Sequence, residues 1–117
     1  MPRLAVQTRI LLAVAPVDFR KGIDGLAAVC RQRLQSDPFS EALFVFRNRR
    51  GTALKILTFD GQGYWLCLKR FSQGKLQWWP KSVEDAVRLT ASQLHILLWN
   101  GNPVGAAIPE DWRRIER

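Results

Sequence analysis

The chain has 117 residues, of which 47% are hydrophobic, and this length fits one folded domain with a substantial core. Eighteen Lys and Arg residues against ten Asp and Glu residues give a formal net charge of +8. This excess favours a polyanionic partner, nucleic acid first and an anionic membrane surface second, over a basic surface that has no partner. Because no apolar run approaches the ~18 residues of a membrane span, we expect a soluble, cytoplasmic protein that does not insert into a membrane.

The first third of the chain predicts a strand followed by a helix. Ile10–Val14 is apolar and is ended by Pro16, which is typical of a buried strand rather than of a short secretion signal. Asp18 is the candidate N-cap of the helix, and Ser36–Pro38 closes it. The helix itself is predicted from apolar residues at helical spacing, which are Ile23, Leu26, Ala27, Cys30 and Leu34.

The middle of the chain predicts antiparallel strands joined by hairpin turns. Turn residues recur at nearly equal spacing in Asn48–Gly51, Asp60–Gly63 and Ser72–Lys75. A meander explains this spacing without an internal repeat. The aromatic and aliphatic segments between the turns are the expected strands, namely Leu43–Arg47, Ala53–Phe59, Tyr64–Phe71 and a short fourth strand, Leu76–Trp79.

The second helix is marked at both of its ends. Thr90 and Gln93 have the spacing of a capping box, and Gly101 stands where a left-handed C-terminal residue is expected. Leu89 and Leu94 occupy the positions of a hydrophobic staple. The tail from Pro109 has the pattern of one more short helix.

Together these elements predict one α+β domain over residues 1–117, with loosely ordered ends at 1–9 and 102–117. The expected architecture is an antiparallel β-meander of three to five strands with two main helices packed on it.

The net charge is concentrated in Leu43–Lys81, which holds eight basic residues and one acid, Asp60, and so carries +7. Arginine pairs with phosphate through two parallel hydrogen bonds, and a turn holds such side chains in solvent. The alternative for cations in turns is protection of the sheet against aggregation. The candidate nucleic-acid-binding residues of this stretch are Arg47, Arg49, Arg50, Lys55, Lys69, Arg70, Lys75 and Lys81.

Two further segments add candidates for nucleic-acid binding. Arg20 and Lys21 precede a Gly-x-x-Gly loop, which can bring backbone amides to phosphate, although Asp24 would repel phosphate and a structural role is the alternative. Trp78 and Trp79 are adjacent, so in a strand they would face opposite sides of the sheet. An exposed tryptophan can stack on an unpaired base or anchor a protein partner, and the sequence does not separate these roles.

No catalytic site, metal site or cofactor is predicted. A two-metal nuclease needs carboxylates that converge from several strands, whereas Asp60 stands in a Gly-rich turn that favours aspartate for local hydrogen bonds. A structural zinc site needs four ligands, and the sequence offers only Cys30, Cys67 and His95. The two cysteines are predicted to be free thiols, and we expect no enzymatic activity.

Six sequence blocks resemble one known family. They are Val17–Ala28, Asp37–Ser40, Leu43–Gly51, Lys55–Leu57, Asp60–Leu66 and Lys69–Phe71. Their order, over about Val17 to Gly101, is similar to that in the TnpB accessory proteins of the IS66 family of bacterial insertion sequences, which the second open reading frame of those elements encodes. The resemblance implies a role in transposition beside a separate transposase that carries the chemistry, and it supplies no catalytic residues. Phe19 stands where methionine is more usual, and Trp99–Gly101 lacks the acidic residue expected before that glycine.

Three functional hypotheses follow from these observations. The first is an accessory factor of transposition that binds DNA at the ends of the element through the basic residues between Arg47 and Lys81. The second is an adaptor that docks the transposase of the same element through Trp78, Trp79 and the helix that begins after Thr90. The third is a nuclease, which has the least support because the carboxylate cluster is missing. The preference for a DNA sequence or strand form and the oligomeric state stay open.

Overall fold

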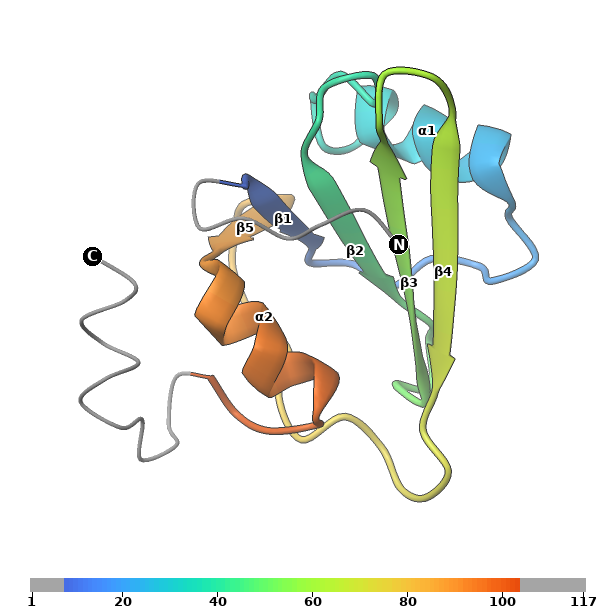
Figure 1. Ribbon diagram of the computed structural model, residues 1–117. Helices are drawn as coiled ribbons and strands as arrows, with labels where there is room; N and C mark the ends of the chain where they lie inside the picture. The colour runs from blue at the N-terminus through green and yellow to red at the C-terminus, as the bar shows by residue number, and fades with distance from the viewer. Residues whose placement is uncertain (1–7, 104–117) are drawn as a thin grey trace.

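A computed structural model describes residues 8–103, which form a five-stranded sheet and two helices (Figure 1). The elements are β1 (Ile10–Ala13), α1 (Ile23–Gln32), β2 (Leu43–Arg47), β3 (Ala53–Phe59), β4 (Tyr64–Arg70), β5 (Ala86–Leu89) and α2 (Ala91–Leu98). The predicted α+β architecture with two main helices is confirmed. The predicted helix from Pro109 and most of the ends expected to be loose lie outside the described residues. Within residues 8–103, neither helix has the length and apolar character that crossing a membrane requires.

The sheet is mixed, with the strand order β4-β3-β2-β1-β5. β1 and β2 are parallel, with Ile10 opposite Leu43 and Leu12 opposite Val45, whereas all other neighbouring strands are antiparallel. Parallel neighbours need a crossover connection, and α1 supplies it. Consequently the C-terminal ends of β1 and β2 lie at the same end of the sheet, next to the loop that leads to α1.

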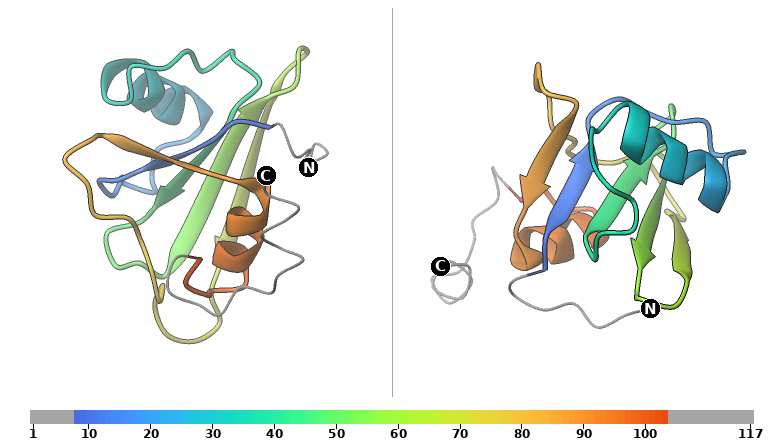
Figure 2. Two further views of the ribbon diagram at one scale, coloured as in Figure 1. Left: turned by 90° about the vertical axis from the view of Figure 1, so that its left-hand side faces the viewer. Right: turned by 90° about the horizontal axis from the view of Figure 1, so that it is seen from above.

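The helices lie on opposite faces of the sheet, as the side view in Figure 2 shows. On the α1 face, Leu26 and Cys30 pack with Phe44 and Phe46 in one buried cluster. On the α2 face, Leu94 and other apolar residues form a second buried cluster with inward-facing residues of β1, β2 and β3. Because alternate residues of a strand point to opposite faces, the central strands β2 and β3 are apolar almost throughout rather than alternating.

The predicted fourth strand, Leu76–Trp79, is wrong. This segment crosses the α2 face as an irregular chain, and its backbone groups bond outside the sheet: the Gln77 N–H donates to Asn100 Oδ1 at 3.0 Å. Its apolar residues cover the α2-face cluster, which explains why they resembled a strand. The fifth strand of the sheet is β5, which pairs antiparallel with β1 and was not predicted because four residues, one of them charged, give little pattern.

The start of α2 follows the sequence prediction, and its end differs by one residue. Thr90 and Gln93 exchange both bonds of the capping box, at 3.1 and 2.9 Å. The left-handed residue at the C-terminus is Asn100, with φ 60°, rather than Gly101. The N–H of Gly101 donates to the carbonyl of Ile96, and a Cβ at Gly101 would stand 2.8 Å from the Ile96 side chain. Glycine is therefore required there for close approach and not for a positive φ.

Candidate nucleic-acid interface

A cleft of about 300 Å³ lies at the C-terminal ends of the parallel strands β1 and β2. One wall is the loop that follows β1, with Pro16, Asp18 and Phe19, and the other is the turn between β2 and β3, with Arg49 and Arg50. Open α/β sheets bind ligands preferentially at such carboxyl ends, because loops from neighbouring strands converge there. This convergence brings two arginines of the predicted interface to the border of a concave site.

The turn that carries Arg49 and Arg50 is held rigidly by its neighbours. Asn48 Oδ1 accepts hydrogen bonds from the Thr52 and Ala53 N–H groups at 2.8 and 3.2 Å, and Asn48 Nδ2 donates to the Thr52 hydroxyl at 2.9 Å. Gly51 closes the turn at φ 70°, a backbone conformation that side-chain-bearing residues rarely adopt. Both arginines are exposed, so a fixed backbone presents two cations to solvent.

The acid that borders the cleft is already paired. The Asp18 carboxylate accepts hydrogen bonds from the Arg20 guanidinium, the shortest at 2.6 Å, and from the Arg20 backbone N–H at 2.9 Å. These side-chain and backbone hydrogen bonds lower the pKa of Asp18 to about 2. The predicted role of Asp18 as a helix N-cap is wrong, because α1 begins after Gly22 and its N-cap makes no side-chain bond. Arg20 thus offsets the local acid and leaves Arg49 and Arg50 uncompensated.

Lys55 of β3 is bound to the loop between β1 and α1. Its ammonium donates to the carbonyl of Phe19 at 2.8 Å and to that of Lys21 at 3.0 Å. The same ammonium stands 5.0 Å from the centre of the Phe19 ring, within cation–π range. The Lys55 side chain is partly buried. This residue, predicted to contact nucleic acid, is therefore bonded within the protein to the loop between β1 and α1. Lys21 itself is exposed on that loop.

Arg47 and Trp79 lie together on the α2 face, and both are partly buried. The Arg47 guanidinium carbon is 5.9 Å from the centre of a Trp79 ring, and Arg47 Nη1 donates to the carbonyl of Asn48. The Trp79 indole N–H donates to the carbonyls of Ala13 and Val14 at 3.1 and 3.2 Å. Trp78 is also partly buried, against the α2-face cluster. Both tryptophans are therefore only partly exposed to solvent.

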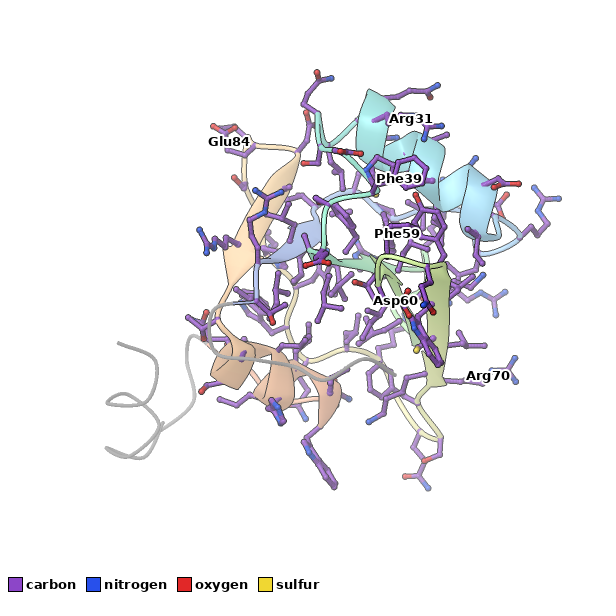
Figure 3. The ribbon with its side chains drawn as sticks, turned by 45° about the horizontal axis from the view of Figure 1, so that its top comes forward. Arg31, Phe39, Phe59, Asp60, Arg70 and Glu84 are labelled. Carbon is purple, nitrogen blue, oxygen red and sulfur yellow. The ribbon has the colours of Figure 1, made fainter. Side chains whose placement is uncertain are left out.

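The remaining predicted cations are Lys69 and Arg70 at the end of β4, and Lys75 and Lys81 in the irregular segment between β4 and β5. Lys69 donates to the carbonyl of Leu98 at the C-terminus of α2, where a cation complements the helix dipole. Arg70, Lys75 and Lys81 are exposed, and Figure 3 shows Arg70 pointing away from the sheet. Arg49 and Arg50 thus border the cleft, whereas Lys69, Arg70, Lys75 and Lys81 belong to the end of β4 and the segment that follows it. The Leu76 N–H donates to the Gly51 carbonyl, so this segment passes next to the turn that carries the two arginines.

The most exposed aromatic side chain among residues 8–103, Trp99, was not among the predicted site residues. It is 84% exposed at the C-cap of α2, and the Lys69 ammonium lies 5.7 Å from its ring centre. The helical period does contain this signal. With Leu94 and Leu97 on the buried face of α2, a residue two positions further along points away from it.

Asp60 has the local role that its turn position indicates. Its carboxylate accepts hydrogen bonds from the N–H groups of Gln62 and Gly63 at 2.9 and 3.0 Å, and from the Trp65 indole at 2.7 Å. The Gln62 bond leads the causes that lower the pKa of Asp60. Across residues 8–103, no three His, Cys, Asp or Glu side chains gather in a group able to hold a metal.

Comparison with known proteins identifies the family to which the chain belongs. The family model described as "IS66 Orf2 like protein" matches residues 8–104. Two relatives come from Sinorhizobium fredii (strain NBRC 101917 / NGR234), and no solved structure matches the chain. The uncharacterized protein y4jC is 33% identical over 93% of this chain and 85% of its own length. The uncharacterized protein y4hO is 37% identical over 77% of each chain. Because the family model spans most of the chain, this protein belongs to the IS66 Orf2-like family of insertion-sequence-associated proteins.

Proposed function

We propose that the protein is a non-catalytic accessory factor of transposition that binds DNA phosphates at the cleft between the β1–α1 loop and the β2–β3 turn. The observation that carries this proposal is the pair of exposed arginines, Arg49 and Arg50, fixed at the cleft border by the Asn48 hydrogen bonds. A rigid turn loses little conformational freedom when two guanidinium groups bind phosphate, which favours affinity.

The electrostatic balance around the cleft supports the same proposal. Asp18 is the one acid among the lining residues, and Arg20 neutralises it, so the lining keeps two uncompensated positive charges. The ion pair between Asp18 and Arg20 involves neither Arg49 nor Arg50, so both arginines are open to a polyanion.

The test is a titration of DNA carrying the ends of the element, followed by fluorescence anisotropy over a series of salt concentrations. Loss of two phosphate contacts in Arg49→Ala/Arg50→Ala should reduce the slope of log K against log salt by about 1.8, at about 0.9 per contact. The matched control is Arg31→Ala/Arg33→Ala, which removes two exposed arginines at or next to the end of α1. Equal effects of both double variants, or no binding at low salt, would contradict the proposal.

The second candidate function, an adaptor that docks the transposase, is favoured by the exposure of Trp99. An 84% exposed indole is typical of the tryptophans that anchor protein interfaces. The proposed anchor is Trp99 rather than Trp78 or Trp79. A pull-down of the transposase from nuclease-treated material distinguishes the two functions: retention that Trp99→Ala abolishes favours the adaptor, and loss on nuclease treatment favours DNA bridging.

A further inference from the structure

β4 forms an open edge of the sheet. It is the outermost strand in the order β4-β3-β2-β1-β5, at the right of Figure 1, and no other segment of residues 8–103 pairs with its outer side. β4 has seven residues, Tyr64–Arg70, whereas β5 at the opposite edge has four. Natural sheets usually shorten, interrupt or cover such an edge, because its free peptide groups pair with another strand. Because β4 has seven residues and contains no proline, its outer edge can accept a partner strand.

The register of β4 identifies the peptide groups that face outward. The Phe71 N–H donates to the Thr52 carbonyl, so these two residues form a hydrogen-bonded pair at the end of the β3–β4 ladder. Hydrogen-bonded and non-hydrogen-bonded pairs alternate along an antiparallel ladder. The peptide groups of residues 65, 67, 69 and 71 therefore face β3. Those of Tyr64, Leu66, Leu68 and Arg70 face outward and offer four N–H donors and four carbonyl acceptors.

We propose that two copies of the chain pair through β4 in antiparallel orientation, with the two-fold axis at Cys67. This is the one antiparallel register in which all seven residues of β4 lie opposite a residue of β4 in the second copy. It places Leu66 opposite Leu68 of the second copy, and Cys67 opposite its own counterpart. Tyr64 then faces Arg70, and Trp65 faces Lys69.

The side chains of β4 are complementary to themselves in this register. Leu68 is 57% exposed and Trp65 is 43% exposed, and both lose solvent contact when a second strand is added. Each cation lies opposite an aromatic ring and not opposite another cation, and such cross-strand pairs stabilise sheets. A parallel pairing in register would instead align like-charged Lys69 and Arg70 with their own copies. Charge thus selects the antiparallel arrangement.

The interface is independent of the proposed DNA cleft. The lining residues of the cleft, Pro16–Phe19 and Asn48–Arg50, do not belong to β4. A dimer would therefore carry two clefts related by the two-fold axis and one continuous ten-stranded sheet. Failure of DNA binding would leave the β4 interface intact, and a monomeric protein could still bind DNA through its single cleft.

Cys67 provides a direct test of the register. As residue 67 forms a non-hydrogen-bonded pair with its counterpart, the two Cα atoms should stand about 4.5 Å apart, within the range that a disulfide bridges. Adding diamide, which accepts the two protons and two electrons of the two thiols, should yield a covalent dimer on a non-reducing gel. Cys67→Ser should abolish this dimer. Cys30→Ala should retain it, because Cys30 is fully buried and cannot contribute a thiol.

Sedimentation equilibrium of the reduced protein tests the association without a crosslink. The expected mass is twice the 13.4 kDa of one chain at micromolar concentration. Trp65→Lys should dissociate the dimer, because the new lysine lies opposite Lys69 of the second copy and the two positive charges repel each other. Trp65→Glu should retain the dimer, because the new carboxylate lies opposite that same lysine. Leu68→Pro removes an outward N–H without touching the bonds to β3 and should give a folded monomer, with retained circular dichroism as the check on folding. A monomeric wild-type protein, or a dimer that survives both Trp65→Lys and Leu68→Pro, would overturn the proposal.

Discussion

Substitution of Lys55 tests whether this cation has a structural role or a role in binding DNA. In Lys55→Met the unbranched chain is kept, while the ammonium that donates to the Phe19 and Lys21 carbonyls is lost. Hydrogen bonds that involve a charged group contribute about 1.5–3 kcal/mol each, and the cation–π contact adds about 0.5–1 kcal/mol. Because Lys21 is exposed and water can replace part of these bonds, we expect a net loss of about 2–3 kcal/mol in the free energy of unfolding.

Urea unfolding followed by tryptophan fluorescence measures this loss. For a slope between about 1 and 3 kcal/mol per molar urea, the midpoint should fall by about 0.7–3 M with an unchanged slope. The control is Lys21→Met, which removes a lysine from the same loop whose side chain is exposed, and which should change stability by less than about 0.5 kcal/mol. A stable Lys55→Met protein that had lost DNA affinity would refute the structural role of Lys55 and return it to the interface.

Three further predictions concern local features. Tyr64→Phe should leave the free energy of unfolding unchanged or raise it by about 1 kcal/mol in urea titration, because the buried hydroxyl has no hydrogen-bond partner; a loss above about 1 kcal/mol would contradict this. Thr90→Ala should lower thermal stability by about 1 kcal/mol through loss of the capping bond, and an unchanged Tm would show that the cap is not needed. Asp18, whose pKa falls from 3.8 to about 2 on folding, contributes stability above about pH 4 that is lost as pH falls towards 2. Asp18→Asn should weaken that acid dependence, and an NMR titration of the Asp18 carboxyl with a midpoint near 4 would contradict it.

Local signals in the sequence were sufficient for much of the fold. The spacing of Leu26 and Cys30 predicts the buried face of α1, and the capping box at Thr90 predicts the first residue of α2. The turn residues of Asn48–Gly51 and Asp60–Gly63 predict both hairpins. These signals are reliable because helix periodicity, caps and tight turns are interactions between residues within a few positions of one another. The sequence blocks also identify the family, which the family model confirms.

The distribution of the cations required the tertiary structure. Lys55 and Arg49 belong to the same basic stretch of the sequence, yet one supports a loop that precedes it by more than thirty residues and the other borders a cleft. Strand geometry assigns a side chain to one of two faces, but the packing partner on each face comes from a distant segment. The exposure of Trp99 and the burial of Trp79 were decided in the same way.

The sequence by itself therefore determined the kind of elements, the family and the concentration of charge. Only the tertiary structure decided that β1 is parallel to β2, that β5 rather than Leu76–Trp79 completes the sheet, and that β4 is left as an open edge. Strand order is a choice among distant partners, and local sequence carries little of the energy that decides it. The same choice placed the C-terminal ends of β1 and β2 together and so created the cleft bordered by Arg49 and Arg50.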